Sequence, residues 1–489
     1  TWATTNDLLL YTAYNEPPVA ADDPVVDPRN DGDCLGEVER IRLWIRDLKT
    51  RRPASPISSD GYHSGAGIWL ENNRAIAFVS NRSGTEEGVV SNLAQAFALW
   101  RVDLGTNSER LLADGPGAAV SPTNRSKDDR IAFITAPSLG PHADVMALET
   151  VASDGSSRRA LTSTKHHAVN PESAPMPGPD GSWIVVSSEG TQSILLRVHD
   201  GTPPLKINHV LPHATLPSVD SVSGAIACVT QSATVPQEIE VLDTNGGSVW
   251  RSQHQESSTS AVARIWSIAS TDNVNIQSMA LTSDRKPSGI ILWPHGGPHS
   301  RTTEEYRPDI EAAVSHGFDV IQPNFRGSAG YGREFLLSDR MDLAGGDYQD
   351  CLNALEDWIA TNGRQDLPTF MTGTSYGGYL TAWAIGHTNR FSAAVAVNAV
   401  TNIESFYALT DIPGWVEWEF GGTPLTQRRL IHERSPVRYI NEATTPTLVV
   451  HSAEDRRVPI AQGLELHAAL RDSGVATSFI RYPREYHRI

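Results

Sequence analysis

The serine in segment 373–378, Gly-Thr-Ser-Tyr-Gly-Gly, has the sequence neighbours of an activated nucleophile. The segment follows a short apolar run at 370–371 and precedes a helix-like run at 379–387. In that context a serine lies on a tight strand-to-helix turn that exposes its hydroxyl, and the flanking glycines avoid clashes that a Cβ would make. The helix that follows points its N-terminal N–H groups at the same spot. Because Gly-x-Ser-x-Gly arises by chance in roughly one such chain in four, the assignment of Ser375 depends on partners elsewhere.

A serine nucleophile needs a base within hydrogen-bond reach and a carboxylate that holds that base in one tautomer. In α/β-hydrolases the chain order is serine, acid, histidine. Of the acidic residues after Ser375, Glu454 and Asp455 closely follow an apolar strand at 447–450, unlike Asp411 and Asp472. Asp455 is the predicted acid, because the Arg-Arg-Val-Pro that follows it leads into the next helix. The alternative for a single aspartate after a strand is a helix N-cap.

His487 is the predicted base. It follows the strand at 478–482 through a short loop, which places it on the sheet edge expected for Ser375 and Asp455. His451 precedes the acid at the end of its strand and is the second choice. The other histidines after the serine are His387, His432 and His467, of which the first and the last lie in helical runs.

The oxyanion of an acyl-transfer reaction needs hydrogen-bond donors. The backbone N–H of Tyr376, directly after the nucleophile, is one predicted donor. The second is expected from a loop after an early strand, and segment 294–299, Pro-His-Gly-Gly-Pro-His, follows the strand at 289–293. Gly297 is the predicted second donor, because glycines let the backbone approach a substrate closely; a plain turn is the alternative. This chemistry calls for neither a metal ion nor an organic cofactor.

Strand and helix patterns alternate from about residue 285 onward. Apolar strands are expected at 289–293, 319–321, 393–397 and 447–450, and helical patterns at 308–316 and 347–359. Such alternation predicts a doubly wound, mostly parallel sheet covered on both faces, with its site at the carboxyl ends of the strands. The C-terminal part is therefore predicted to be an α/β-hydrolase domain at 256–489.

The N-terminal part, 1–255, repeats a short β phrase. Ile-Ala, two apolar residues and Ser or Thr occur at 76–80, 131–135 and 226–230, with looser copies at 8–12 and 183–187. Each copy precedes a second strand that ends in an Asp-containing turn, and the period is roughly 45 to 55 residues. This pattern predicts an all-β propeller of five to seven blades that caps the other domain. An irregular β-sandwich is the alternative.

Composition limits the partners and the compartment. The chain has 489 residues, a net charge of −17 and scattered Lys and Arg, which argues against nucleic acid and anionic membranes. It has no apolar run of 18 residues and no signal-peptide pattern at its start. Three distant cysteines show no metal-ligand spacing. We expect a cytoplasmic protein, with a secreted protein whose signal was removed as the alternative, and a homo-oligomer remains open.

Five motifs in this order resemble the prolyl oligopeptidase family of serine peptidases, with the acylaminoacyl-peptidase and dipeptidyl-peptidase V type as the nearest branch. They are His-Gly-Gly-Pro at 295–298, Asn-Phe-Arg-Gly-Ser-Ala-Gly-Tyr-Gly at 324–332, the serine segment, Asp-Arg-Arg-Val-Pro at 455–459 and Tyr-Pro-x-Glu-x-His at 482–487. The resemblance covers 285–489. It implies a propeller over a hydrolase domain, short peptides as substrates, and the roles given above for Ser375, His487, Asp455, Gly297 and Tyr376.

The chain departs from the family pattern in three places. Ser452 stands where the family usually has Gly, so the loop before Asp455 is expected to differ in shape. The family normally adds a helix after the catalytic histidine, and its propeller is longer than 1–255. Either terminal or internal segments are missing from this sequence, or the cap is smaller than in the family, and the sequence does not decide between the two.

Specificity is expected from two groups of residues. Exopeptidases of this kind hold free amino termini with carboxylates, a role open to Glu86 and Glu87, although acidic pairs are usually solvated. An apolar pocket is expected from Tyr407, Trp415 and Trp418, with core packing as the alternative. The predicted activity is removal of an acylated residue or a dipeptide from short peptides. A small-molecule esterase, lactonase or acyl-transferring cyclase could use the same triad, and a propeller binding module with a relic hydrolase domain is the non-enzymatic alternative.

Overall fold

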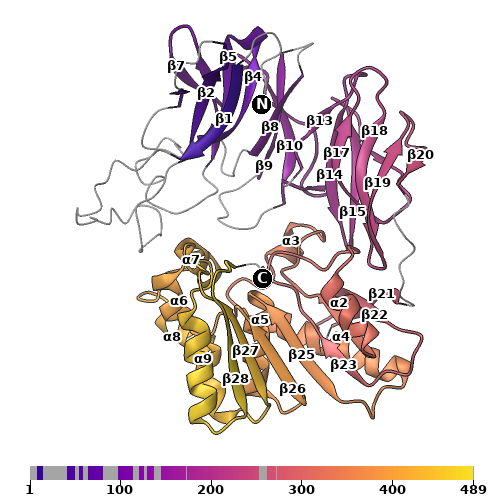
Figure 1. The fold of residues 1–489 in the computed structure, drawn as a ribbon, viewed down its shortest axis with the longest axis vertical. Coiled ribbons are helices and arrows are strands. Elements are labelled where there is room, and N and C mark those ends of the chain that lie inside the picture. The colour runs from indigo at the N-terminus through magenta and orange to yellow at the C-terminus, as the bar shows by residue number, and fades with distance from the viewer. Residues whose placement is uncertain are drawn as a thin grey trace.

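The computed structural model describes residues 8–14, 41–49, 54–58, 64–80, 97–113, 120–125, 129–136, 145–171, 173–252, 261–270 and 272–487. Within these residues the chain forms an all-β part followed by an α/β part, drawn above and below one another in Figure 1. No helix among the described residues is long and apolar enough to cross a bilayer.

The all-β part consists of antiparallel strand groups of the kind that form propeller blades. Three groups are separate sheets. They are β1–β3 (Leu8–Tyr14, Ile41–Asp47, Ser55–Pro56), β4–β7 (Ser64–Leu70, Ala75–Ser80, Ala98–Asp103, Ser108–Ala113, with the 3-10 turn η1 at Glu71–Asn73) and β8–β11 (Val120–Arg125, Arg130–Thr135, Ala147–Ala152, Arg159–Ala160).

Two further groups share one sheet, joined by a parallel pairing of Ser193 with His213. They are β12–β16 (Ala168–Val169, Met176–Pro177, Trp183–Glu189, Gln192–Val198, Leu205–Ile207) and β17–β20 (His213–Val219, Ile226–Ser232, Val235–Leu242, Ser248–Arg251). The repeated phrase of the sequence lies in β1, β5, β9, β14 and β18, one strand in each of the five groups. The phrase is fully buried in β5, β9 and β14, which pack between neighbouring groups, whereas in β1 and β18 some of its apolar residues are only partly buried.

The α/β part is built on one eight-stranded sheet. The strand order is β21-β22-β24-β23-β25-β26-β27-β28, and all pairings from β24 to β28 are parallel. The strands are Val262–Ala269, Asn275–Thr282, Gly289–Leu292, Phe318–Asn324, Thr369–Thr374, Ala393–Val397, Thr447–Ser452 and Thr477–Tyr482, numbered β21 to β28 in chain order. The predicted domain boundary at 255 falls outside the described residues, between the last propeller strand and β21.

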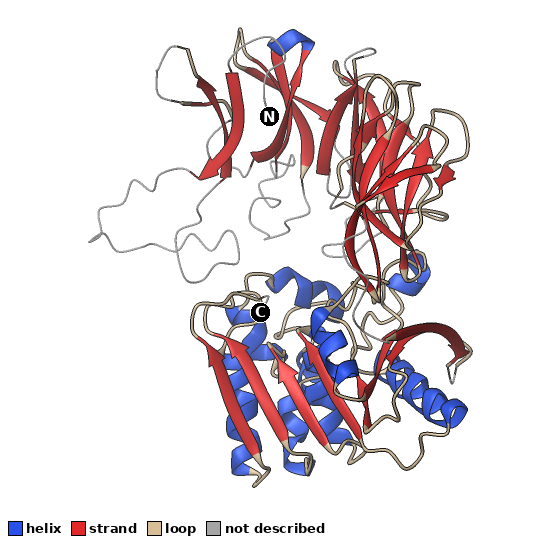
Figure 2. Ribbon diagram, turned by 45° about the vertical axis from the view of Figure 1, so that its right-hand side comes forward, coloured by secondary structure: helices blue, strands red, loops and turns tan. Residues whose placement is uncertain are grey.

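Helices cover both faces of this sheet (Figure 2). Val320 of β24 packs with Ile310 of α2, whereas the next residue, Ile321, packs in the cluster that holds Trp358 of α4. Successive residues of a strand point to opposite faces, so α2 and α4 lie on opposite sides. The helical segments are α2 (Pro308–Ser315), α3 (Arg333–Leu336), α4 (Gly346–Asn362), α5 (Tyr376–His387), α6 (Ile403–Leu409), α7 (Pro413–Phe420), α8 (Arg428–Glu433), the 3-10 segment η2 (Pro436–Glu442) and α9 (Ala461–Asp472).

Candidate active site

Ser375 lies on the sharp turn between β25 and α5. Its φ of 60° and ψ of −117° are uncommon for a residue with a side chain. The turn is possible because its neighbours are glycines: a Cβ on Gly373 would lie 2.4 Å from the carbonyl carbon of Gly377, and one on Gly377 would lie 2.3 Å from the oxygen of Pro294. The serine N–H donates to the oxygen of Val397 on β26 (3.0 Å), which fixes the turn above the sheet.

The three residues predicted to form the catalytic group are linked by two successive hydrogen bonds. The Oγ of Ser375 lies 3.0 Å from Nε2 of His487, and Nδ1 of His487 lies 2.7 Å from Oδ2 of Asp455. The Asp455 side chain is fully buried, and its Oδ1 accepts the N–H of Val458 (2.8 Å). A carboxylate at Nδ1 keeps the proton there and leaves Nε2 free to accept the serine proton.

Asn398 holds the loop that carries His487. Its amide donates to the His487 carbonyl oxygen (2.9 Å) and to the Oγ of Ser452 (3.2 Å), and its Oδ1 accepts the N–H of Ser452 (2.8 Å). Ser452, the departure from the family pattern, therefore ties β27 to β26 through this amide. Sequence reasoning missed Asn398. Its only signal is its position, directly after the apolar strand β26, at the sheet edge that carries the other groups.

Tyr376 begins α5, so its N–H has no partner within the helix and remains the predicted first oxyanion donor. Its phenol points away, into the core, and donates to Oδ2 of Asp347 (2.5 Å). In the facing loop, a Cβ on Gly296 would lie 3.5 Å from the Cβ of Ser375, so this loop lies against the nucleophile. Gly297 has a φ of 125°, which favours glycine. It remains the predicted second oxyanion donor.

The side chain of His295 contacts the core and holds the same loop in place. Its ring stacks on Phe325 at 4.3 Å, with Nδ1 2.7 Å from the Gly296 oxygen and Nε2 2.8 Å from the Oγ of Ser328. Burial lowers the pKa of His295 to about 4, so the ring is neutral at physiological pH. A neutral, buried histidine at this point serves packing and hydrogen bonding of the loop.

The residues considered as alternatives are engaged elsewhere. His451 is buried at the end of β27, before the loop that carries Asp455, and its Nε2 lies 2.8 Å from the Val458 oxygen. His387 stacks on Trp383 at 3.9 Å, and His467 contacts the Thr477 hydroxyl at 3.2 Å. The structure thus brings Asp455 and His487, and none of these three histidines, into the hydrogen-bonded group with Ser375.

The predicted pocket aromatics differ in exposure. Trp415 is buried in the core, where its ring meets Phe406 edge-on. Tyr407 is half-buried and donates to Glu417 (2.7 Å), and Trp418 is half-buried under the guanidinium of Arg340. Tyr407 and Trp418 are therefore better placed than Trp415 to meet a substrate. Glu86 and Glu87 lie outside the described residues.

The C-terminal part of the chain is similar to known peptidases. The model of the prolyl oligopeptidase family matches residues 305–489. The uncharacterized peptidase YuxL of Bacillus subtilis is 35% identical over 202 residues, which are 41% of this chain and 31% of that protein. The acylamino-acid-releasing enzyme of Mus musculus is 32% identical over 214 residues, 42% of this chain and 29% of that protein. The chain thus matches less than a third of the length of these relatives.

Solved structures extend the likeness to both parts of the chain. The acylaminoacyl peptidase of Pyrococcus horikoshii superposes with a TM-score of 0.82 and 19% identity, over 99% of this chain and 76% of that chain. A puromycin-hydrolyzing peptidase of Mycobacterium tuberculosis gives 0.70 and 18%, over 91% and 79%. At this identity the likeness shows the fold: a β-propeller followed by an α/β-hydrolase domain. The predicted fold class is therefore confirmed.

Proposed function

We propose that this chain, whose residues 305–489 match the model of the prolyl oligopeptidase family, is a serine exopeptidase that releases an N-terminal acylated residue from short peptides. The observation that carries the proposal is the hydrogen-bonded chain from Ser375 through His487 to the buried Asp455. Acylamino-acid-releasing enzymes among the relatives favour the acylated substrate over a dipeptide with a free amino terminus.

The geometry supports acyl transfer through a covalent intermediate. Nε2 of His487 takes the hydroxyl proton while Oγ of Ser375 attacks the scissile carbonyl. The N–H of Tyr376, with Gly297 as the second donor, stabilises the negative charge that forms on the carbonyl oxygen. His487 then gives its proton to the leaving amine, and water, activated by the same histidine, releases the acyl group.

A hydrolysis panel tests this function. Wild-type protein and Ser375→Ala would be compared on N-acetylated amino-acid anilides, free dipeptidyl anilides and short-chain esters. We expect the wild type to cleave the N-acetylated anilides. In Ser375→Ala, turnover should fall by at least about 10⁴-fold. Preference for free dipeptides would replace the acylated substrate class, and turnover of esters alone would favour the small-molecule hydrolase. Equal turnover by the variant would refute the mechanism.

A further inference from the structure

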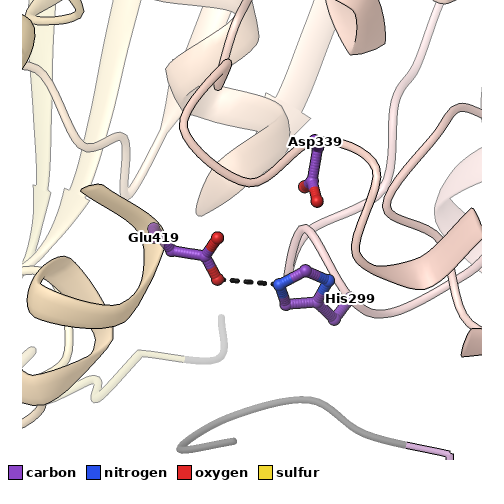
Figure 3. A group of neighbouring side chains, drawn as sticks. All are labelled: His299, Asp339 and Glu419. Carbon is purple, nitrogen blue, oxygen red and sulfur yellow. Dashed lines mark hydrogen bonds and ion pairs between the residues drawn. The ribbon is translucent and has the colours of Figure 1, made fainter. Parts of the chain in front are cut away.

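A second group of ionisable side chains includes one residue of the loop at 294–299, named the oxyanion loop after the predicted role of Gly297. His299 is two residues after Gly297, Asp339 follows α3, and Glu419 is on α7. One ligand atom from each lies within 4.8 Å of the other two. Figure 3 shows the two carboxylates directed toward the imidazole from different segments. The catalytic mechanism uses none of these groups.

The carboxylates of this group are buried without enough partners. Asp339 and Glu419 are fully buried, and both Asp339 oxygens and Oε2 of Glu419 lack a hydrogen-bond partner among the described residues. A buried carboxylate is costly unless a proton, a cation or hydrogen bonds compensate it.

Three arginines of the surrounding segments, Arg326, Arg340 and Arg434, are engaged with other groups. Arg326 pairs with Asp272 and Asp350, and Arg434 pairs with Asp342. Arg340 stacks on Trp418 and donates to the Trp418 oxygen. Among these side chains, the imidazole of His299 is therefore the one cationic group that contacts the carboxylates.

His299 is oriented as a metal ligand would be. Its Nδ1 lies 3.0 Å from the carbonyl oxygen of Gly327, to which an N–H at that position donates. Nε2 faces Oε1 of Glu419 at 2.7 Å, a distance at which a proton on Nε2 joins the two atoms as an ion pair. A metal ion bound to Nε2 would take the place of that proton and would keep the carboxylate beside the ring. A backbone carbonyl on the far ring nitrogen is the usual support of a metal-binding histidine.

We propose that His299, Asp339 and Glu419 form a binding site for a divalent transition-metal ion of the zinc class. One imidazole nitrogen and two carboxylates are ligands that Zn²⁺ accepts, whereas Mg²⁺ and Ca²⁺ prefer all-oxygen sites. The bound ion joins the oxyanion loop, the segment after α3, and α7. The three ligands are 40 and 80 residues apart in the chain and follow no known ligand spacing, so no sequence motif points to this site. The site does not depend on the proposed peptidase activity.

Metal content and affinity test the site. The full chain, without a histidine tag, would be stripped with a chelator, reconstituted with Zn²⁺ and desalted. We expect close to one zinc per chain by mass spectrometry of the metal, and a thermal midpoint that rises with Zn²⁺. Asp339→Asn should weaken zinc binding in calorimetry by about 10-fold or more. Glu419→Gln provides a second ligand variant if the first does not fold.

Two controls locate the zinc. Asp342 is three residues after Asp339, and its carboxylate pairs with Arg434. The control variant Asp342→Asn should bind zinc like the wild type. His487→Gln should also keep the zinc; its loss there would place the ion at the catalytic histidine and overturn the proposal. The proposal would also be overturned if the wild-type chain retained no zinc, or if Asp339→Asn bound zinc as tightly as the wild type. A proton would then hold the group, since burial raises the pKa of Asp339 to about 8.

Discussion

At the scale of single residues, Asp455 serves two partners with its two oxygens. Oδ1 accepts the Val458 N–H, and Oδ2 accepts the His487 Nδ1–H. Both bonds require an acceptor, and the side chain is fully buried, so no water replaces either partner. The carboxylate thus fixes both the acid loop and the tautomer of the base.

Asp455→Asn tests this dual role. With Oδ1 kept on the Val458 N–H, the amide NH₂ faces Nδ1 of His487 and forces the ring proton onto Nε2, where it cannot accept the serine proton. We expect kcat to fall by about 10⁴-fold with little change in fold. Steady-state kinetics with circular dichroism would measure both. A loss of less than tenfold would show that Asp455 does not control the tautomer.

Asp347 is a buried acid beneath the nucleophile turn, in contact with the Tyr376 phenol. Burial raises its pKa to about 6, above the value near 3.9 of an unfolded chain. The folded state therefore favours the protonated acid, and stability falls as the pH rises from about 4 to about 6. Asp347→Asn mimics the protonated form, because its Oδ1 still accepts the phenol proton.

The variant Asp347→Asn should be more thermostable than the wild type at pH 7, and this advantage should shrink at pH 4. A pKa that is higher by about 2 in the folded state corresponds to a difference on the order of 2–3 kcal/mol in the free energy of unfolding. Thermal melts at the two pH values would measure the difference. An advantage that is the same at pH 4 and pH 7 would contradict the raised pKa.

At the scale of elements, the turn between β25 and α5 depends on contacts that leave no room for a Cβ. Gly377→Ala would force the helix away from the Pro294 oxygen, and with it the loop that carries Gly297. We expect a destabilisation of about 1–3 kcal/mol, seen as a midpoint lower by several degrees, together with reduced kcat.

Gly105→Ala is the matched control, because nothing lies within 4 Å of a Cβ at that propeller turn. Its thermal midpoint and kcat should remain close to those of the wild type. If Gly377→Ala and Gly105→Ala have the same thermal midpoint and kcat, the close contact at the turn between β25 and α5 is not the reason why position 377 requires glycine.

The elements also explain which parts of the site could be predicted. Ser375, Asp455 and His487 each follow a strand of the parallel sheet, so local pattern and strand order place them on one edge. Asn398 and the group around His299 could not be found in this way. Their roles come from contacts between distant segments, and single polar residues in loops carry no local signal of such contacts. For the same reason the sequence did not distinguish the buried Trp415 from the half-buried Tyr407 and Trp418, because helical spacing does not separate core residues from pocket residues.

At the scale of the whole molecule, a propeller hairpin is bound to the segment after the oxyanion loop. Arg301 donates to the carbonyl oxygens of Gly190 (2.6 Å) and Gln192 (2.8 Å) and to the Oγ of Ser193 (2.7 Å). Glu304 accepts the Thr191 hydroxyl proton (2.9 Å). These bonds join the β14–β15 turn to a segment that begins four residues after Gly297, so propeller and active site are mechanically connected.

Arg301→Ala should loosen this connection. We expect calorimetry to show a lower and broader unfolding transition, or two transitions, and kcat/KM to fall because the oxyanion loop loses an anchor. Arg429→Ala, at a side chain that is 90% exposed in an i,i+4 pair, is the control and should change neither. A single, unshifted transition in Arg301→Ala would show that the two domains are coupled by other contacts.

The central claim is that Ser375 is a nucleophile activated by His487. The most direct measurement is labelling of the full chain with a serine-reactive fluorophosphonate, followed by mapping of the modified peptide. The account predicts one adduct, on Ser375, in the wild type, and strongly slowed labelling in His487→Gln. No adduct on Ser375, or equally fast labelling without His487, would contradict it.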